Sequence, residues 1–136
     1  MILGIGLDLC ETHRLKRAMA RPAFVKRVFS PAEVSVCKGR RDRLLCYAAR
    51  FAAKEAYFKA IGTGWGNGVG WLDVEVTSDG SGPPRLLVSG GARRVARSLG
   101  VKKVHLSLTH TGDYAAAMVV IEGPGRRKGS SNSQRR

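Results

Sequence analysis

The sequence predicts an α+β fold in which an antiparallel sheet packs against one long central helix. A segment rich in helix-forming residues, RLLCYAARFAAKEAYFKAI, occupies residues 43–61. Residues 104–109 alternate in polarity, residues 114–121 are apolar, and the short loop THTGD joins them in the pattern of a β-hairpin. Strand and helix patterns do not alternate regularly, which argues against a sheet built from βαβ units. The α+β class follows from these three observations.

The first third of the chain begins with a strand. Residues 2–9 form an apolar run interrupted by two glycines, which is typical of a buried strand that another backbone approaches closely. A short helix is expected at residues 12–20. The segment SPAE at residues 30–33 marks a second helix start, with Ser as the N-cap, Pro at the first helical position and Glu three residues after the cap. We expect this helix to end by residue 39.

The central helix at residues 43–61 is closed by Gly62. A glycine-rich segment, GTGWGNGVG, follows it at residues 62–70. The remaining elements expected before the C-terminal hairpin are a strand at residues 71–77, a strand at residues 85–88 and a helix at residues 92–99.

The length of 136 residues fits one domain with a core just large enough to be stable alone. Hydrophobic residues make up 43% of the chain, which excludes a wholly disordered protein. No apolar run approaches the roughly 20 residues of a membrane-spanning helix. The apolar N-terminus lacks a basic lead-in and contains Asp8, so it does not resemble a signal peptide. We expect a globular protein that does not enter a membrane.

The chain is strongly basic, with 24 Lys and Arg residues against 10 Asp and Glu residues. Residues 124–136 contain five of these basic residues and no acidic or large apolar residue, which predicts a disordered basic tail after a domain at residues 1–123. A second concentration of positive charge covers residues 14–43. This charge is typical either of a solvated surface or of a surface that binds an anionic partner.

Three cysteines, Cys10, Cys37 and Cys46, form no CxxC pair. Because three cysteines cannot all be paired within one chain, the simplest interpretation is free thiols in a reducing cytosol. We therefore expect a cytoplasmic protein.

Asp8 and Glu55 are candidate metal ligands. Asp8 ends an apolar strand, where a carboxylate is costly unless it is compensated, although it could instead cap the following helix. Glu55 lies on the mostly apolar side of the central helix, one turn before Lys59, although the two could form an ordinary surface pair. Two carboxylates from separate elements suit Mg²⁺, which often binds one or two carboxylates together with substrate phosphates. Lys59 would then neutralise phosphate charge or protonate a leaving oxygen.

Further candidate residues for anion binding are cationic or lie in loops. Arg50 and Lys54 are like charges four residues apart on the central helix, which suggests that they share an anion. The glycine-rich segment would offer backbone amides to a phosphate, but it lacks the lysine and spacing of a P-loop and could be a loop without this role. His105 and His110 should point to opposite faces of a strand, so they should not bind one metal together. We expect His105 to be structural and His110 to contact an anion.

The segments GIGLDLCETHRL, RFAAKEAYFKAIGTG and HLSLTHTGDYAAAMVVIEG resemble, in order and separation, the three motifs of the bacterial holo-[acyl-carrier-protein] synthases. These enzymes are short, single-module 4′-phosphopantetheinyl transferases. The resemblance covers residues 1–123 and implies one transferase domain. It also implies transfer of the phosphopantetheine arm of coenzyme A to a serine of apo acyl carrier protein, dependent on Mg²⁺, with release of adenosine 3′,5′-bisphosphate.

The resemblance also implies roles for individual residues. Asp8 and Glu55 would hold Mg²⁺, Lys59 would assist departure of the nucleotide, and Glu55 is one of two candidates for the general base. Arg14 and Arg21 would bind the acidic acyl carrier protein. The residues implied in coenzyme A binding are Arg50, Lys54, Lys59, Gly62, Thr63, Gly64 and His110, with one of Arg40, Arg41 and Arg43 at the 3′-phosphate. Members of the family are homotrimers with active sites at the subunit boundaries, so a homotrimer is expected.

A small basic nucleic-acid-binding protein is the alternative that the charge alone suggests. The aromatic residues are few and lie mostly in apolar patterns, and no nucleic-acid-binding motif occurs. Carboxylates that face a helical lysine also have no purpose in a protein that binds a phosphate backbone. We therefore expect no specific binding to nucleic acid.

Overall fold

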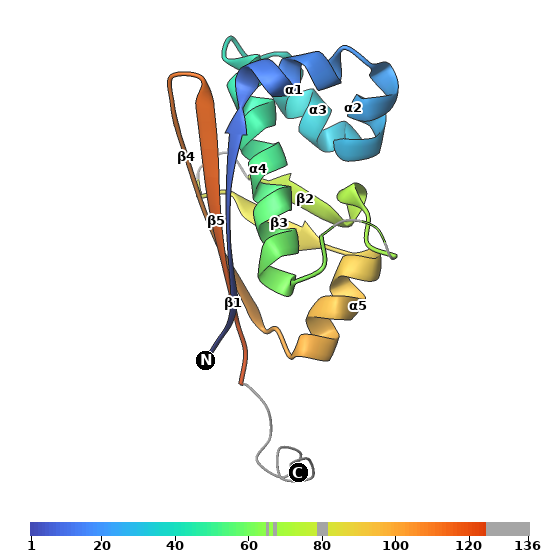
Figure 1. The fold of residues 1–136 in the computed structure, drawn as a ribbon, viewed down its shortest axis with the longest axis vertical. Coiled ribbons are helices and arrows are strands. Elements are labelled where there is room, and N and C mark those ends of the chain that lie inside the picture. The colour runs from blue at the N-terminus through green and yellow to red at the C-terminus, as the bar shows by residue number, and fades with distance from the viewer. Residues whose placement is uncertain (65, 67, 79–81, 125–136) are drawn as a thin grey trace.

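The computed structural model describes residues 1–64, 66, 68–78 and 82–124. The elements in chain order are β1 (Ile2–Glu11), α1 (Thr12–Met19), α2 (Pro22–Val28), α3 (Pro31–Lys38), α4 (Arg43–Ile61), the 3₁₀ helix η1 (Trp71–Asp73), β2 (Val74–Thr77), β3 (Arg85–Val88), α5 (Gly90–Leu99), β4 (Lys103–Thr111) and β5 (Tyr114–Glu122). A three-stranded sheet lies along one side of α4, α1 to α3 gather at one end of the molecule, and α5 lies at the other (Figure 1). The expected α+β fold, with an antiparallel sheet against a central helix, is confirmed.

The sheet has the strand order β1-β5-β4, and both pairings are antiparallel. Side chains alternate between its two faces, so the inner face of β5 is fully buried against α4. On β1 the same alternation turns Gly6, Asp8 and Cys10 inward and leaves Ile5 and Leu7 exposed. The inward position of Asp8 is therefore set by its register in the strand.

Two glycines bring β1 into direct backbone contact with α4. A Cβ atom on Gly6 would overlap the carbonyl oxygen of Ala56, and one on Gly4 would overlap the carbonyl oxygen of Ala60. No residue with a side chain fits at either position without moving the strand from the helix. The close backbone approach expected from the glycines is confirmed, and it fixes Asp8, two residues after Gly6, at a short distance from α4.

A buried ion pair joins α3 to α4. The Nζ atom of Lys54 lies 2.9 Å from Oε1 of Glu33, and both side chains are fully buried. Glu33 also forms the expected capping box with Ser30 and accepts a hydrogen bond from the backbone N–H of Val76. Lys54 donates a further hydrogen bond to the carbonyl oxygen of Trp71. Burial lowers the pKa of Lys54, and the Glu33 carboxylate opposes this shift.

A disulfide bond joins Cys37 at the end of α3 to Cys46 in the first turns of α4. The expectation of free thiols is therefore wrong for these two residues and correct for Cys10, which is free and buried. The two cysteines are nine residues apart, and the chain reverses between two helices, so only the tertiary fold brings their Cα atoms to 5.5 Å. The sequence spacing alone carried no sign of this pairing.

Two elements differ from the expected ones. Helix α2 was not predicted, because its seven residues are too few to show a helical period. The strand expected at residues 71–77 begins with η1, and only its second half pairs with β3. Trp71 is buried in η1, where its ring stacks on Phe51 with centroids 5.0 Å apart. Packing against α4 thus replaces strand pairing at this position.

The expected basic tail lies outside the described residues, except for Pro124, as do residues 65 and 67 of the glycine-rich segment. The domain boundary after residue 123 therefore stays a prediction. In the described part of the chain, none of the helices combines the length and the apolar character needed to cross a membrane.

Candidate active site

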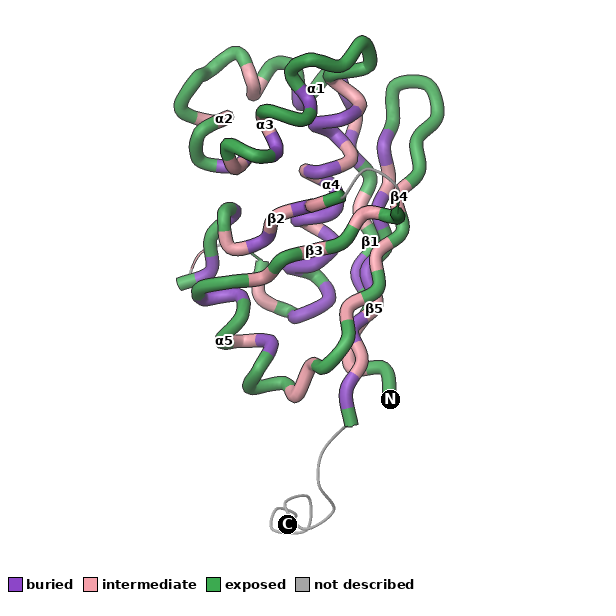
Figure 2. Tube along the Cα trace, turned by 180° about the vertical axis from the view of Figure 1, so that it is seen from behind, coloured by how far each residue is buried: buried purple, intermediate pink, exposed green. Residues whose placement is uncertain are grey.

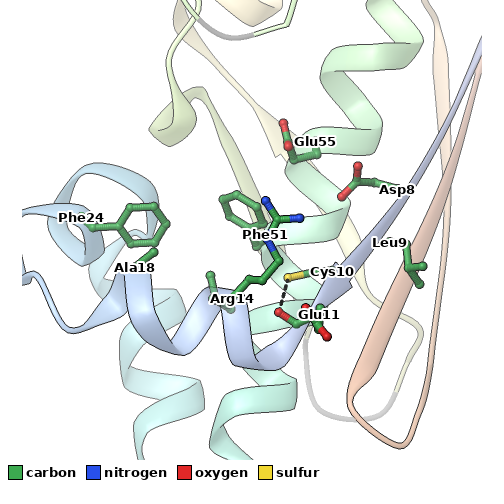
Figure 3. A pocket seen from close by; sticks show the side chains of 10 residues that line it. Asp8, Leu9, Cys10, Glu11, Arg14, Ala18, Phe24, Phe51 and Glu55 are labelled. Atoms are coloured by element: carbon green, nitrogen blue, oxygen red, sulfur yellow. Dashed lines mark hydrogen bonds between the residues drawn. The ribbon is translucent and has the colours of Figure 1, made fainter.

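A cavity of about 380 Å³ opens between the C-terminal half of β1, α1 and α4 (Figure 3). Asp8 enters it from β1 and Glu55 from α4, and both carboxylates point into the same space. Arg14 extends from α1 towards them. The first turn of α1 is fixed because the backbone N–H of Thr12 donates to the carbonyl oxygen of Asp113, at 2.8 Å. Three separate elements therefore hold the charged groups of this cavity.

Lys59 pairs with Asp8 at the edge of the cavity. Its Nζ atom lies 3.0 Å from Oδ1 of Asp8 and donates a second hydrogen bond, also of 3.0 Å, to the carbonyl oxygen of Leu7. Asp8 lies inside β1, and the N-cap position of α1 belongs to Glu11, so Asp8 does not cap that helix. The Asp8 carboxylate thus already has one cationic partner, supplied by α4.

Glu55 has a raised pKa. Partial burial is the largest cause, the negative charge of Asp8 adds to it, and the positive charge of Lys59 opposes it. Burial, Asp8 and Glu55 likewise raise the pKa of the Cys10 thiol to about 11, so this thiol stays protonated near neutral pH and is not a nucleophile there. The negative charges of the two carboxylates raise the pKa of neighbouring groups, and a bound cation would stabilise both carboxylates in their charged form.

The pair of Asp8 and Glu55 suits Mg²⁺ better than a transition metal. The described residues contain no group of three or more His, Cys, Asp or Glu side chains placed to bind a metal ion. Mg²⁺ keeps several water molecules and commonly uses only one or two protein carboxylates, completed by substrate phosphates. The donors present, all oxygen, match this preference.

A second cavity, of about 160 Å³, lies between α4, the segment before it and the end of β4. Its lining brings together Arg40, Arg50 and His110, with Asp42 paired to Arg40 at 3.0 Å. Arg50 is buried and donates to Sγ of Cys46 at 3.1 Å, but its Nε atom has no hydrogen-bond partner among the described residues. An unpartnered guanidinium nitrogen beside two further basic side chains suits an anionic ligand.

A family model described as the 4′-phosphopantetheinyl transferase superfamily matches residues 4–119. The chain belongs to this superfamily. The holo-[acyl-carrier-protein] synthase of Anaeromyxobacter dehalogenans (strain 2CP-1) is 52% identical over 92% of this chain and 99% of the relative. The synthase of the same name from Desulforudis audaxviator is 47% identical, and the match covers both chains completely.

Solved structures of holo-[acyl-carrier-protein] synthases have the same fold. The protein from Bacillus anthracis, in complex with CoA (3′,5′-ADP), is 39% identical with a TM-score of 0.75, over 90% of this chain and 98% of that one. The protein from Neisseria meningitidis is 33% identical with a TM-score of 0.80, over 90% and 99% of the two chains. The resemblance found in the sequence is thus confirmed, and the chain is a transferase of the holo-[acyl-carrier-protein] synthase group.

Lys54 does not face either cavity of the transferase, which corrects the expectation that it binds coenzyme A. Its side chain is fully buried and pairs with Glu33. Glu33 also acts electrostatically on Arg50, since its charge opposes the lowering of the Arg50 pKa that burial causes. The anion that pairs with Lys54 is therefore an internal carboxylate rather than a phosphate, whereas Arg50 lines the second cavity.

The other expected coenzyme contacts of the transferase follow α4. Gly62 ends this helix in the left-handed conformation, one turn after Lys59. The Thr63 hydroxyl donates to the carbonyl oxygen of Gly64, at 2.7 Å. These residues extend the line of Glu55 and Lys59 beyond the end of the helix. Their expected role in coenzyme A binding stays a prediction.

The remaining expected residues lie on the surface. Arg21 is exposed at the N-cap of α2 and does not line the cavity that contains Arg14. His105 points to the outer face of the sheet and pairs with Glu122 at 2.7 Å, whereas His110 lies on the opposite face. The opposite orientation of the two histidines is therefore confirmed, and the structural role of His105 stays a prediction.

The aromatic part of the first cavity was not predicted from the sequence. Phe51 and Phe24 form one of its walls, with ring centroids 6.1 Å apart. Phe51 precedes Glu55 by four residues on α4, so helical spacing could have placed it there. Phe24 belongs to α2, the helix that was not predicted, and no local signal placed it near the site.

Proposed function

We propose that the protein transfers 4′-phosphopantetheine from coenzyme A to a serine of apo acyl carrier protein, in a Mg²⁺-dependent reaction that releases adenosine 3′,5′-bisphosphate. The observation that carries this proposal is the meeting of Asp8 and Glu55 in one cavity, with Lys59 paired to Asp8, in a chain of this superfamily. In the reaction, the serine oxygen forms a bond to the phosphorus nearest the pantetheine, and the bond from this phosphorus to the nucleotide breaks.

Most of the rate enhancement in such a transfer comes from positioning and charge stabilisation. Asp8 and Glu55 would hold the Mg²⁺, which when bound neutralises negative charge on the pyrophosphate. Lys59, more than half exposed and one turn from Glu55, can turn from Asp8 to the leaving phosphate. Glu55 points into the cavity beside Asp8, within the space that the serine hydroxyl would enter, and is the candidate proton acceptor there. We assign it the proton of the serine hydroxyl.

The second cavity would bind the 3′-phosphate of coenzyme A. Arg50, His110 and Arg40 provide three basic side chains there, and Arg40 is the member of the group Arg40, Arg41 and Arg43 that lines it. The two cavities share no lining residue. One coenzyme molecule needs both a carboxylate site for its pyrophosphate and a cationic site for its 3′-phosphate. Both requirements would be met if the second cavity of a neighbouring subunit lay beside the first cavity of this one.

The outer face of the sheet supports a homotrimer. Ile5, Leu7 and Leu9 of β1 and Tyr114 and Met118 of β5 are all exposed. These two strands are direct neighbours, so the side chains form one apolar area on the face opposite α4. A contiguous exposed apolar area on a sheet is typical of a surface that a protein partner covers. We propose that this face packs against two further copies of the chain.

The acidic carrier protein would bind at α1 and the start of α2. Helix α1 has no acidic residue in its first turn and exposes Arg14, Lys16 and Arg17, and Arg21 follows it. This basic surface adjoins the cavity of Asp8 and Glu55. A carrier protein docked there would present its serine beside the proposed reaction centre, and complementary charge would speed the encounter.

The deciding experiment is mass spectrometry of an apo acyl carrier protein after incubation with the protein, coenzyme A and Mg²⁺. The carrier protein should gain the mass of one phosphopantetheine group, and the gain should disappear with a chelator or with a carrier whose serine is replaced by alanine. No mass gain would overturn the proposed transfer. A gain that persists without metal would overturn the Mg²⁺ dependence alone.

A further inference from the structure

A third cavity, of about 340 Å³, lies between β3, α5 and the start of β4. Figure 2 shows these three elements on the face of the molecule that is seen from behind. The cavity shares no lining residue with the two cavities of the proposed active site. Most of its wall is aliphatic, formed by Leu86, Leu87, Val88, Ala96, Val101 and Val104.

The polar part of the lining is entirely basic apart from one tyrosine. Arg93, Arg97 and Lys102 line the cavity, and all three are exposed to solvent. Arg93 and Arg97 lie four residues apart on α5, so their charges repel each other. No carboxylate contributes to the lining. An anionic ligand would relieve this repulsion, and a ligand without charge would not.

The tyrosine in the wall is Tyr57 of α4. Its side chain is fully buried, and its hydroxyl has no hydrogen-bond partner among the described residues. A buried polar group without a partner is unfavourable and rare in native proteins. The hydroxyl has no accessible surface in this structure, so a ligand oxygen in the cavity would satisfy it once a small displacement of the wall exposes it. The hydroxyl thus indicates a ligand independently of the basic side chains.

We propose that this cavity binds a free fatty carboxylate of medium chain length. The carboxylate group accepts hydrogen bonds from Arg93, Arg97 and the Tyr57 hydroxyl, and Lys102 adds a further positive charge. The hydrocarbon chain lies along the aliphatic wall. The volume is at the lower end of the range for ligand sites, roughly 300–1,000 Å³, so one chain of medium length fits better than a nucleotide. This inference does not depend on the proposed transfer reaction.

Isothermal titration calorimetry with octanoate tests the proposal, with octanol and acetate as controls. Octanol keeps the chain without the charge, and acetate keeps the charge without the chain. Octanoate should bind at one site per chain, at least about tenfold more tightly than either control. Equal binding of octanol would show a purely apolar groove, and equal binding of acetate would show a non-specific basic surface. Either result, or no binding of octanoate, would overturn the proposal.

Two variants locate the site. Arg97→Gln should weaken octanoate binding about tenfold, whereas Arg94→Gln, on the same helix but outside the cavity lining, should leave it unchanged. Tyr57→Phe should also weaken binding, because the carboxylate loses a donor. Equal effects of the two arginine variants would overturn the assignment to this cavity. Modification of the carrier protein should be unchanged in Arg97→Gln, which serves as the control for correct folding.

Discussion

The Nζ atom of Lys54 lies 2.9 Å from Oε1 of Glu33, and neither side chain reaches solvent. Five residues further along the same helix, Lys59 is more than half exposed and pairs with Asp8 at the edge of the candidate active site. One helix thus carries one lysine that supports the core and another that faces the proposed substrate.

Lys54→Met should destabilise the protein by about 3–5 kcal/mol, because it leaves the Glu33 carboxylate buried without its partner. The free energy of unfolding, measured by urea denaturation, would show the loss. Lys59→Met is the matched control, and its exposed position predicts a much smaller change in stability. A Lys54→Met protein with normal stability but weaker coenzyme A binding would restore Lys54 to the coenzyme site.

Asp8→Asn and Glu55→Gln should each lower the rate of carrier-protein modification by at least about a hundredfold while the protein stays folded. Each change removes one of the two charges that would hold Mg²⁺. Turnover and the far-UV circular dichroism spectrum would be measured together. Asp113→Asn, at an exposed carboxylate outside the cavity lining, should keep normal turnover. Near-normal rates in either site variant would contradict the assignment as metal ligands.

Arg50→Gln should raise KM for coenzyme A about tenfold or more and leave KM for 3′-dephospho-coenzyme A nearly unchanged. The reason is that only the first substrate carries the phosphate that the second cavity would bind. Arg41→Gln provides the comparison, because Arg41 does not line that cavity. If Arg50→Gln impaired both substrates equally, its guanidinium would not be the partner of the 3′-phosphate.

Arg21→Glu should raise KM for the acyl carrier protein more than KM for coenzyme A. The difference between the two increases should be larger at low ionic strength, where charges are screened less. Arg21 is a cleaner probe than Arg14, because Arg14 also lines the cavity of Asp8 and Glu55. Steady-state kinetics with each substrate varied in turn would measure the difference. The same charge reversal at Arg94, on α5 at the other end of the molecule, should have no such effect.

Burial raises the pKa of Tyr57 to about 12, and this makes the stability depend on pH in alkaline solution. Above pH 10 the unfolded chain loses the tyrosine proton while the folded chain keeps it, so this group favours unfolding increasingly until about pH 12. The loss should total about 3 kcal/mol. Tyr57→Phe should remove this part of the decline, as shown by urea unfolding at several pH values. If the free energy of unfolding of Tyr57→Phe fell with pH as steeply as that of the unchanged protein, Tyr57 would not be the group responsible. Tyr114→Phe, at an exposed side chain, is the control.

Local signals were sufficient for most of the fold. The bounds of α4 and β3 were predicted as the structure has them, because helix formers, a closing glycine and alternation are properties of neighbouring residues. The sequence motifs identified Asp8, Glu55 and Lys59 as residues of one site, and in the structure Asp8 lines a cavity with Glu55 and pairs with Lys59.

Neither the environment of Lys54 nor the pairing of Cys37 with Cys46 could be predicted from local signals, because both depend on how separate segments pack. Helical spacing places Lys54 near Arg50, but which segment covers that face depends on how α3 and β2 pack. The two cysteines likewise meet only because α3 and α4 fold back on each other. In both cases the deciding contact joins residues whose sequence separation carries no periodic signal.

The contact between Gly6 and the carbonyl oxygen of Ala56 has a consequence for comparing relatives. The spacing of Asp8 and Glu55 depends on the absence of a Cβ atom at Gly6, two residues before Asp8, because that atom would overlap the carbonyl oxygen of Ala56, one residue after Glu55 on the helix. A related chain could retain both carboxylates and still lose the reaction through one alanine at this position. Retention of the two glycines is therefore as strong a criterion for a working enzyme as retention of the acidic residues themselves.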